Sequence, residues 1–211
     1  MSFSIYFLYS SKVVAPTQCN SPLASVGLKI LDASNDLLSE GSVESLTIAK
    51  ISEFADLKRT STYKFFETPD EIKQALIKKY IQDCNAHLEE NLTKNSEGDY
   101  LACLKECVVS IIEFFQSHPG AQKLILENTV SPPILSSDLH EIAETILKHI
   151  EKSVGLPNMF NKSGVFLVVT QIVISILSLN TKENSGLTDV GLNEAVRAAN
   201  AYLLSCIATP A

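Results

Sequence analysis

The chain has 211 residues, of which 45% are hydrophobic and 19% are charged. This composition supplies enough apolar material for a packed interior and too little charge for a disordered chain. The formal net charge of −7 argues against non-specific coating of nucleic acid, which a basic surface drives, and leaves room only for a small local DNA-reading surface.

Apolar residues recur at three- and four-residue spacing along most of the chain, which predicts an all-α fold. Residues 1–22 have no clear periodicity and are expected to form an N-terminal extension. Their short apolar stretch has no basic residue before it, so it makes a poor secretory signal. Ser21 and Pro22 then make a good helix start, and Gly41 makes a good helix end.

Two short helices are predicted next, over about residues 46–55 and 58–65. Asp56 falls in the turn between them, where the backbone needs a left-handed conformation that Asp tolerates better than most residues. Ser52 is small enough to let the second helix cross closely. Thr68, followed by proline, predicts the start of a longer helix.

The rest of the chain is predicted to form helices separated by Pro, Gly and polar loops, giving about nine helices in total. Asp138 and Glu141 form a plausible capping pair for a helix that reaches Val154. The apolar run over residues 165–179 falls short of the roughly twenty residues needed to cross a bilayer. We therefore expect no membrane span there, but a helix buried on most sides.

The segment from Leu57 to Phe66 carries three basic residues and no acidic one. Its arginine can bond a guanine edge, its short hydroxyl side chains can reach bases or phosphates, and its tyrosine can reach a phosphate. A short helix with these side chains is suited to the major groove of DNA.

Four local patterns occur in order between Ile30 and Leu76: Ile30-Leu31-Asp32-Ala33, Thr47-Ile48, Tyr63 with Phe66, and Thr68. Together they resemble the N-terminal region of the TetR family of transcriptional regulators. The resemblance implies a three-helix helix-turn-helix DNA-binding domain over residues 23–68. It also implies a larger helical domain for ligand binding and dimerisation over residues 69–211.

The resemblance further implies a cytoplasmic homodimer, most simply a repressor, that binds palindromic operator DNA and is released by a small apolar or amphipathic effector. The family pattern has a glycine where this chain has Asp56, a leucine at Thr62 and often a lysine at Pro69. The resemblance implies phosphate contacts for Thr47, Tyr63 and Lys64 and base contacts for Arg59, Thr60 and Ser61. The side chains of the short helix itself add Lys58 and Thr62 as DNA-binding candidates.

The charge balance keeps an alternative function open. Residues 23–91 hold eight Lys and Arg against twelve Asp and Glu, although DNA binding draws on positive charge. The alternative is a helical interaction or ligand-binding protein of the same fold that has lost DNA binding.

Aromatic and polar side chains of the second half are candidates for an effector pocket, although aromatic residues at helical spacing also fill cores. Two of them interrupt an apolar helix and need partners, which a ligand or a neighbouring helix can supply. The candidates are Tyr80, Phe114, Phe115, His118, Gln122, Phe166, Thr170 and Gln171. The small residues of the last two long helices favour a four-helix bundle between two subunits.

Other clusters favour simpler interpretations. The five cysteines include no CxxC pair, which is typical of reduced thiols. Cys103 and Cys107 share a helix face, with Cys84 on the helix before; a thiol sensor or soft-metal site is conceivable, but core filling is favoured. His140 and Glu144 are expected to be solvated rather than to bind metal. The sequence contains no P-loop, GxGxxG, HExxH or GxSxG motif, so we expect neither enzyme nor cofactor.

Overall fold

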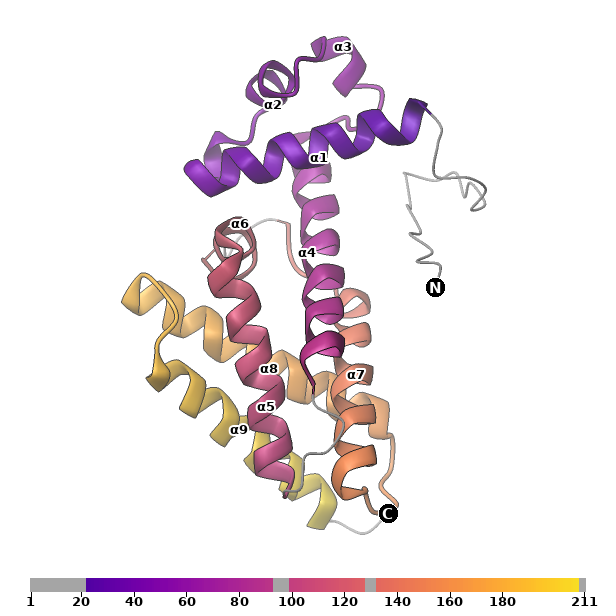
Figure 1. The fold of residues 1–211 in the computed structure, drawn as a ribbon, viewed down its shortest axis with the longest axis vertical. Helices are drawn as coiled ribbons and strands as arrows, with labels where there is room; N and C mark the ends of the chain where they lie inside the picture. Colours follow the sequence, from indigo (N-terminus) through magenta and orange to yellow (C-terminus); the bar gives the residue numbers. More distant parts are fainter. Residues whose placement is uncertain (1–21, 93–98, 128–131, 209–211) are drawn as a thin grey trace. The chain divides into compact units, whose positions relative to one another are not determined.

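The computed structural model describes residues 22–92, 99–127 and 132–208. Over these residues the chain is all-helical, which confirms the predicted fold class, and it divides into two compact units after Ile72 (Figure 1). Most of the predicted N-terminal extension, the predicted cap Ser21 and parts of two predicted loops lie outside the described residues.

The first unit is built from α1, a short 3-10 turn, α2, α3 and the first turn of α4. Helix α1 packs against α2, and α2 packs against α3. Buried apolar side chains of α1 and α2 form the core of this unit, and Gly41 ends α1 by donating its N–H to Leu37 O at 2.8 Å. The bounds are α1 Pro22–Glu40, the 3-10 turn Val43–Ser45, α2 Ile48–Phe54 and α3 Arg59–Thr62.

The second unit contains the rest of α4 and all later helices. Helix α8 packs against both α7 and α9, and α5 packs against the same two helices. A π-helical turn, Gln122–Glu127, follows α6 and also packs on α8. The bounds are α4 Pro69–Asn91, α5 Tyr100–Ser117, α6 Pro119–Ala121, α7 Ser136–Val154, α8 Lys162–Asn184 and α9 Asp189–Ala208.

The start of α4 confirms the predicted cap. Thr68 Oγ1 accepts the backbone N–H of Glu71 at 3.3 Å, and Glu71 Oε2 accepts the N–H of Glu67 at 2.7 Å. The N–H of Glu71, in the first turn, has no acceptor within the helix, and the N–H of Glu67 precedes the helix. Both groups are satisfied by these two side chains. This cap fixes the end of the DNA-binding candidate segment.

The predicted cap of α7 is wrong. The helix begins at Ser136, two residues before Asp138, and Leu135 at its N-cap makes no side-chain hydrogen bond. Asp138 instead lies in the first turn, where a carboxylate interacts favourably with the helix dipole. The predicted end is confirmed, because Gly155 follows the helix with a φ of 71°.

Helix α8 is longer than predicted, and among residues 165–179 only the stripe through Val168, Gln171, Ser175 and Leu179 is exposed. It is the one helix among the described residues that is long and apolar enough to cross a membrane, and half of its apolar window is buried in the protein. Val168 and Leu179 remain 39% and 57% exposed. Helices α7 and α9 and the π-helical turn pack on α8, and these two side chains lie on the stripe that they leave exposed.

Candidate functional site

Thr47, the first of the predicted DNA-binding residues, directly precedes α2. Its Oγ1 accepts the backbone N–H of Lys50 at 3.3 Å, which makes Thr47 the N-cap, and its side chain is exposed. Ile48 and Ile51 are buried on the inner side of the helix. The apolar residues therefore fix the rotation of α2 and leave Thr47 at the surface.

The turn after α2 has the left-handed backbone that the sequence predicts. Asp56 has a φ of 51°. The N–H of Leu57 donates to Ser52 O at 2.8 Å and the N–H of Asp56 donates to Glu53 O at 3.2 Å, which is the bonding of a Schellman motif. These two bonds set the direction in which the chain enters α3.

A buried pair of hydroxyl groups joins α2 to α3. Ser52 Oγ lies 2.6 Å from Ile48 O and 2.8 Å from Thr62 Oγ1, and both side chains are almost fully buried. The single proton of Ser52 is used on the Ile48 carbonyl, so Thr62 donates to Ser52. A hydrogen bond, rather than apolar packing alone, positions α3 on α2.

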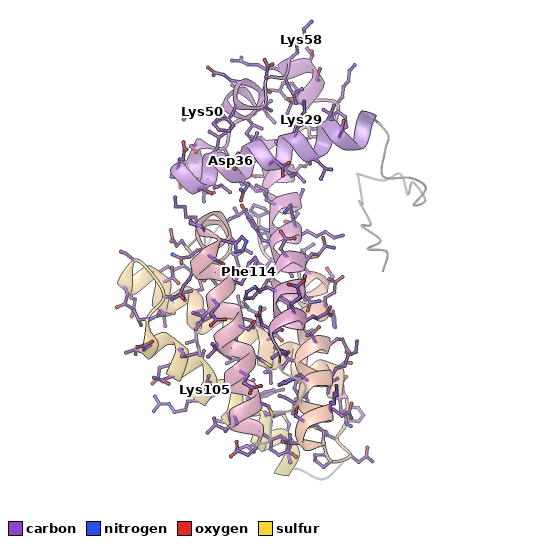
Figure 2. The ribbon with its side chains drawn as sticks, in the orientation of Figure 1. Lys29, Asp36, Lys50, Lys58, Lys105 and Phe114 are labelled. Carbon is purple, nitrogen blue, oxygen red and sulfur yellow. The ribbon has the colours of Figure 1, made fainter. Side chains whose placement is uncertain are left out.

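The outer side of the α3 segment exposes a group of polar and cationic side chains, which we call the α3 surface: Lys58, Arg59, Thr60, Tyr63 and Lys64. Tyr63 is 53% exposed and Ser61 is half-buried beside this surface. Figure 2 labels Lys58 at the α3 end of the first unit, projecting outward. The surface thus holds three cations and no carboxylate of its own.

Thr62 corrects one of the sequence predictions. It is fully buried and its hydroxyl is bonded to Ser52, so its side chain is not part of the α3 surface. The reason is that α3 is only four residues long, and one of the four must face α2. The other predicted DNA-binding residues are at least partly accessible.

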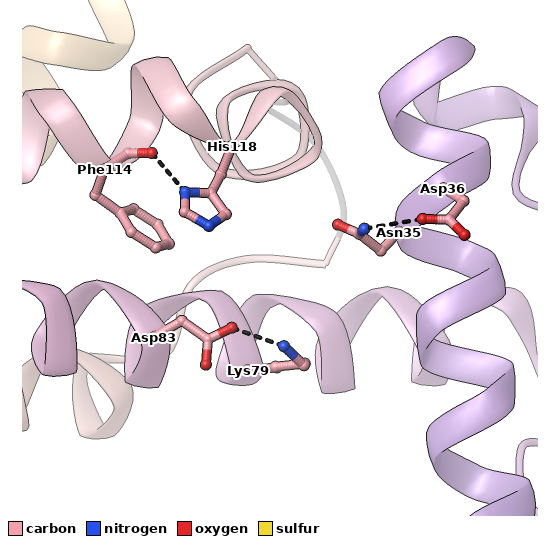
Figure 3. A network of polar contacts seen from close by, with 6 residues as sticks. All are labelled: Asn35, Asp36, Lys79, Asp83, Phe114 and His118. Carbon is pink, nitrogen blue, oxygen red and sulfur yellow. Dashed lines mark hydrogen bonds and ion pairs between the residues drawn. The ribbon is translucent and has the colours of Figure 1, made fainter.

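The predicted effector residues of the second unit divide into a buried aromatic group and a surface group. Phe114 meets Phe115 edge-on at 5.5 Å between ring centroids and stacks on His118 at 4.2 Å. His118 is itself exposed, and its Nδ1 lies 2.8 Å from Phe114 O (Figure 3). Tyr80, Phe115 and Phe166 are buried.

Three polar candidates have partners that need no ligand. Thr170 is buried, and its hydroxyl donates to Phe166 O within the same helix at 2.9 Å. Gln122 donates to Glu127 at 3.1 Å on the surface. Gln171 is exposed and donates to Ser175 at 3.1 Å, so the structure does not bring it together with the buried aromatic group.

Sequence reasoning missed two residues of the second unit that have buried polar atoms without partners. The ring of His87 on α4 lies 6.0 Å from the ring of Phe114. The Nε2 of His87 and the Oγ of Ser110 are both buried and without a hydrogen-bond partner. Ser110 lies in an otherwise apolar stretch of α5, whereas His87 lies among polar residues of α4, and neither pattern signals that a polar atom would be left unpaired.

The three cysteines singled out from the sequence are core residues. Burial and the neighbouring Asp83 carboxylate raise the pKa of Cys84 to about 12. Burial, Cys103 and Glu106 raise the pKa of Cys107, and burial also raises that of Cys103. The thiols are therefore uncharged at neutral pH, as core filling requires. Among the described residues no three His, Cys, Asp or Glu side chains gather to hold a metal ion.

Helices α8 and α9 each keep a partly apolar outer stripe. On α8 the stripe runs through Val168, Gln171, Ser175 and Leu179, and on α9 it runs through Val190, Glu194, Arg197, Ala201 and Leu204. Glu194 and Arg197 form an ion pair within the second stripe. The loop between the helices is held by Asn180, whose side chain bonds both the N–H and the hydroxyl of Thr188 at 2.9 Å.

The fold and the first unit together define an all-helical protein with a helix-turn-helix module at its front. No family model and no curated protein matches the sequence, but many solved structures match the fold. A TetR-family transcriptional regulator from Streptomyces coelicolor is 21% identical, with a TM-score of 0.65 over 86% of this chain and 99% of that one.

Two further matches have named roles or ligands. RolR, in complex with resorcinol, is 15% identical, with a TM-score of 0.64 over 90% of this chain and 97% of RolR. SmeT, the repressor of a multidrug efflux pump of Stenotrophomonas maltophilia, is 16% identical, with a TM-score of 0.55 over 85% of this chain and 89% of SmeT. The chain therefore has the fold of TetR-family transcriptional regulators, as the sequence motifs predict.

Proposed function

We propose that the protein is a homodimeric TetR-type transcriptional regulator, most simply a repressor, and not an enzyme. In this proposal the α3 surface enters the major groove of a palindromic operator, and a small molecule bound in the second unit releases the DNA. Two of the structural neighbours described above are named as a transcriptional regulator and a repressor, which supports this proposal.

The observation that carries the proposal is the local geometry of α3. A left-handed turn at Asp56 and the Ser52–Thr62 hydrogen bond hold a short helix on α2 with its cationic side outward. We assign base contacts to Arg59, Thr60 and Ser61. We assign phosphate contacts to Thr47, Lys58, Tyr63 and Lys64, which fix the register of the helix on DNA.

Dimerisation would double the number of DNA contacts, because it adds a second α3 surface. A single short helix makes few contacts, whereas two copies one helical turn apart can read a palindrome. The outer stripes of α8 and α9 are the surfaces we assign to the two-fold contact, because Leu179 and Val190 are 57% and 68% exposed in one chain. Large exposed apolar side chains on adjacent helices are typical of such contacts.

The dimer proposal is tested by the molar mass in solution. Light scattering should give twice the chain mass for the native protein and for Leu101→Glu, which adds the same charge at a 44% exposed leucine of α5. Leu179→Glu should give the monomer mass. A native monomer, or a Leu179→Glu dimer, contradicts the assignment.

The operator is tested by selecting bound fragments from genomic DNA. The native protein should enrich a small set of fragments that share a palindrome. Arg59→Ala should lose discrimination at one base pair of each half-site, at a cost of about 1–3 kcal/mol per contact. Lys152→Ala, at an exposed position of α7, is the matched control. No enriched fragment contradicts the proposal.

The acidic first half favours one alternative, a helical interaction or ligand-binding protein that has lost DNA binding. Residues 23–91 carry four more acidic than basic side chains, twelve against eight. Such a protein would bind its ligand and form the dimer without enriching any fragment. The two experiments above separate the two functions.

A further inference from the structure

Two buried polar atoms without hydrogen-bond partners lie on α4 and α5, and one of them belongs to His87, whose ring lies 6.0 Å from the Phe114 ring between centroids. They are Nε2 of His87 on α4 and Oγ of Ser110 on α5. Ser110 is 4% exposed. A buried polar atom without a hydrogen bond is costly, and native proteins keep few of them. An unpaired atom on each of these two helices suggests that something else supplies the hydrogen bond.

Helix geometry places both atoms at the same aromatic side chain. Ser110, Phe114 and His118 are four residues apart and so lie on one face of α5. Side chains on a helix lean toward its N-terminus, so the Phe114 ring covers the turn that carries Ser110. The same ring lies 6.0 Å from His87 and 4.2 Å from His118 between centroids.

We propose that the effector is a small neutral aromatic compound with a hydroxyl group, which bonds His87 Nε2 and Ser110 Oγ while its ring packs beside Phe114. The proposal rests on the effector response proposed above and adds the chemical class of the ligand. It assigns to His87 and Ser110 the selection of the hydroxyl, a role separate from the apolar packing of the aromatic residues.

The two polar atoms select a hydroxyl group by their donor and acceptor properties. Imidazole Nε2 donates in one tautomer and accepts in the other, and a serine hydroxyl does both. A ligand hydroxyl also does both, so it pairs with either tautomer. A carbonyl only accepts, and a methyl group leaves both protein atoms unpaired.

The surroundings select a neutral compound. Within α4 itself, the Lys or Arg residue that comes last before His87 is Lys79, eight residues earlier and about 12 Å away along the helix axis. Lys79 is already bonded to Asp83 at 2.7 Å (Figure 3). A carboxylate at His87 and Ser110 would therefore be buried without a counter-charge, which is unfavourable.

The test measures binding of phenol, toluene, cyclohexanol and benzoate to the full-length protein by calorimetry, without DNA. We expect phenol to bind about tenfold more tightly than toluene, since one or two added hydrogen bonds have this effect. Cyclohexanol and benzoate should bind more weakly than phenol. Equal binding of phenol and toluene, or binding of no probe, overturns the proposal.

Two variants assign the preference to the named atoms. Ser110→Ala and His87→Phe should each bring the phenol-to-toluene ratio toward one and leave toluene binding unchanged. Both should raise the melting temperature of the ligand-free protein, because each removes an unpaired buried polar atom. Ser39→Ala, at an exposed serine of α1, should change neither quantity. A ratio that stays at tenfold in both variants overturns the assignment.

The experiments distinguish failure of this ligand class from failure of the regulator proposal. Phenol selectivity without any enriched genomic fragment would uphold the ligand class and reject DNA binding. Enriched fragments without phenol selectivity would uphold the regulator and reject the ligand class.

Discussion

The hydroxyl pair that joins α2 to α3 allows a quantitative test of how the α3 surface is positioned. The single variants are Ser52→Ala and Thr62→Val, and the third variant combines them. Ser52→Ala removes the acceptor of the Thr62 hydroxyl and leaves that hydroxyl buried without a partner. Thr62→Val leaves Ser52 bonded to the Ile48 carbonyl at 2.6 Å, so no atom loses its only partner.

These differences set the expected free energies of local opening. Ser52→Ala should lower the opening free energy of the α2–α3 segment by about 1–3 kcal/mol, the cost of an unpaired buried hydroxyl. Thr62→Val should lower it by about 0.5–1.5 kcal/mol, the net value of an ordinary hydrogen bond. The double variant should lie near the native protein, because replacing both partners by apolar groups of similar shape is nearly neutral.

Hydrogen exchange of the backbone amides of residues 46–66, followed by mass spectrometry, measures this opening. A tenfold change in exchange rate corresponds to about 1.4 kcal/mol when opening is an equilibrium step. Because the double variant should lie near the native protein, the cycle should give a coupling energy of about 1.5–4.5 kcal/mol, the sum of the two single-variant losses. Additive effects, with the double variant the least protected of the three, would refute the claim that this hydrogen bond positions α3.

Three further predictions concern the backbone and the thiols. Asp56→Gly should raise the free energy of unfolding in urea by about 0.5–1 kcal/mol, because glycine adopts a positive φ without steric cost; a loss of stability contradicts the left-handed turn. Gly155→Ala should cost about 1–3 kcal/mol, since its φ of 71° and ψ of 157° suit only glycine, whereas Gly186→Ala, in open space without a positive φ, should be neutral. Cys84, with its pKa raised to about 12, should resist alkylation at pH 8 in the native protein and react in urea, as read by mass spectrometry. Because the folded state holds this proton more tightly, its contribution to stability is complete below pH 9 and is lost as the pH rises above it; stability that increases above pH 9 contradicts this sign.

Local chemistry explains why some features could be predicted from the sequence. Asp56 is one of few residue types that tolerate a left-handed backbone, and it lies between two apolar helical patterns. Thr68 before a proline is a strong helix start, and the structure shows its cap. Such signals depend on neighbours within a few residues, so the order and approximate bounds of the helices follow from the sequence.

Features that depend on distant contacts could not be predicted in this way. Thr62 is one of four polar residues in a helix of one turn, and no periodicity shows which of the four faces α2. Gln171 interrupts an apolar helix and so suggested a buried polar group, but α8 is apolar on its exposed side as well. His87 and Phe114 lie on different helices. Their contact depends on how the two helices pack, which the local sequence pattern does not predict.

The central claim is that the α3 surface binds DNA through its cations, and salt dependence tests it most directly. Affinity for a selected fragment should fall steeply with salt concentration, and Lys64→Gln should reduce the slope of log K against log[salt] by about 2, because a dimer loses two phosphate contacts. Lys152→Gln on α7 should leave the slope unchanged. Binding with no salt dependence, or equal slopes for the native protein and Lys64→Gln, would contradict the account.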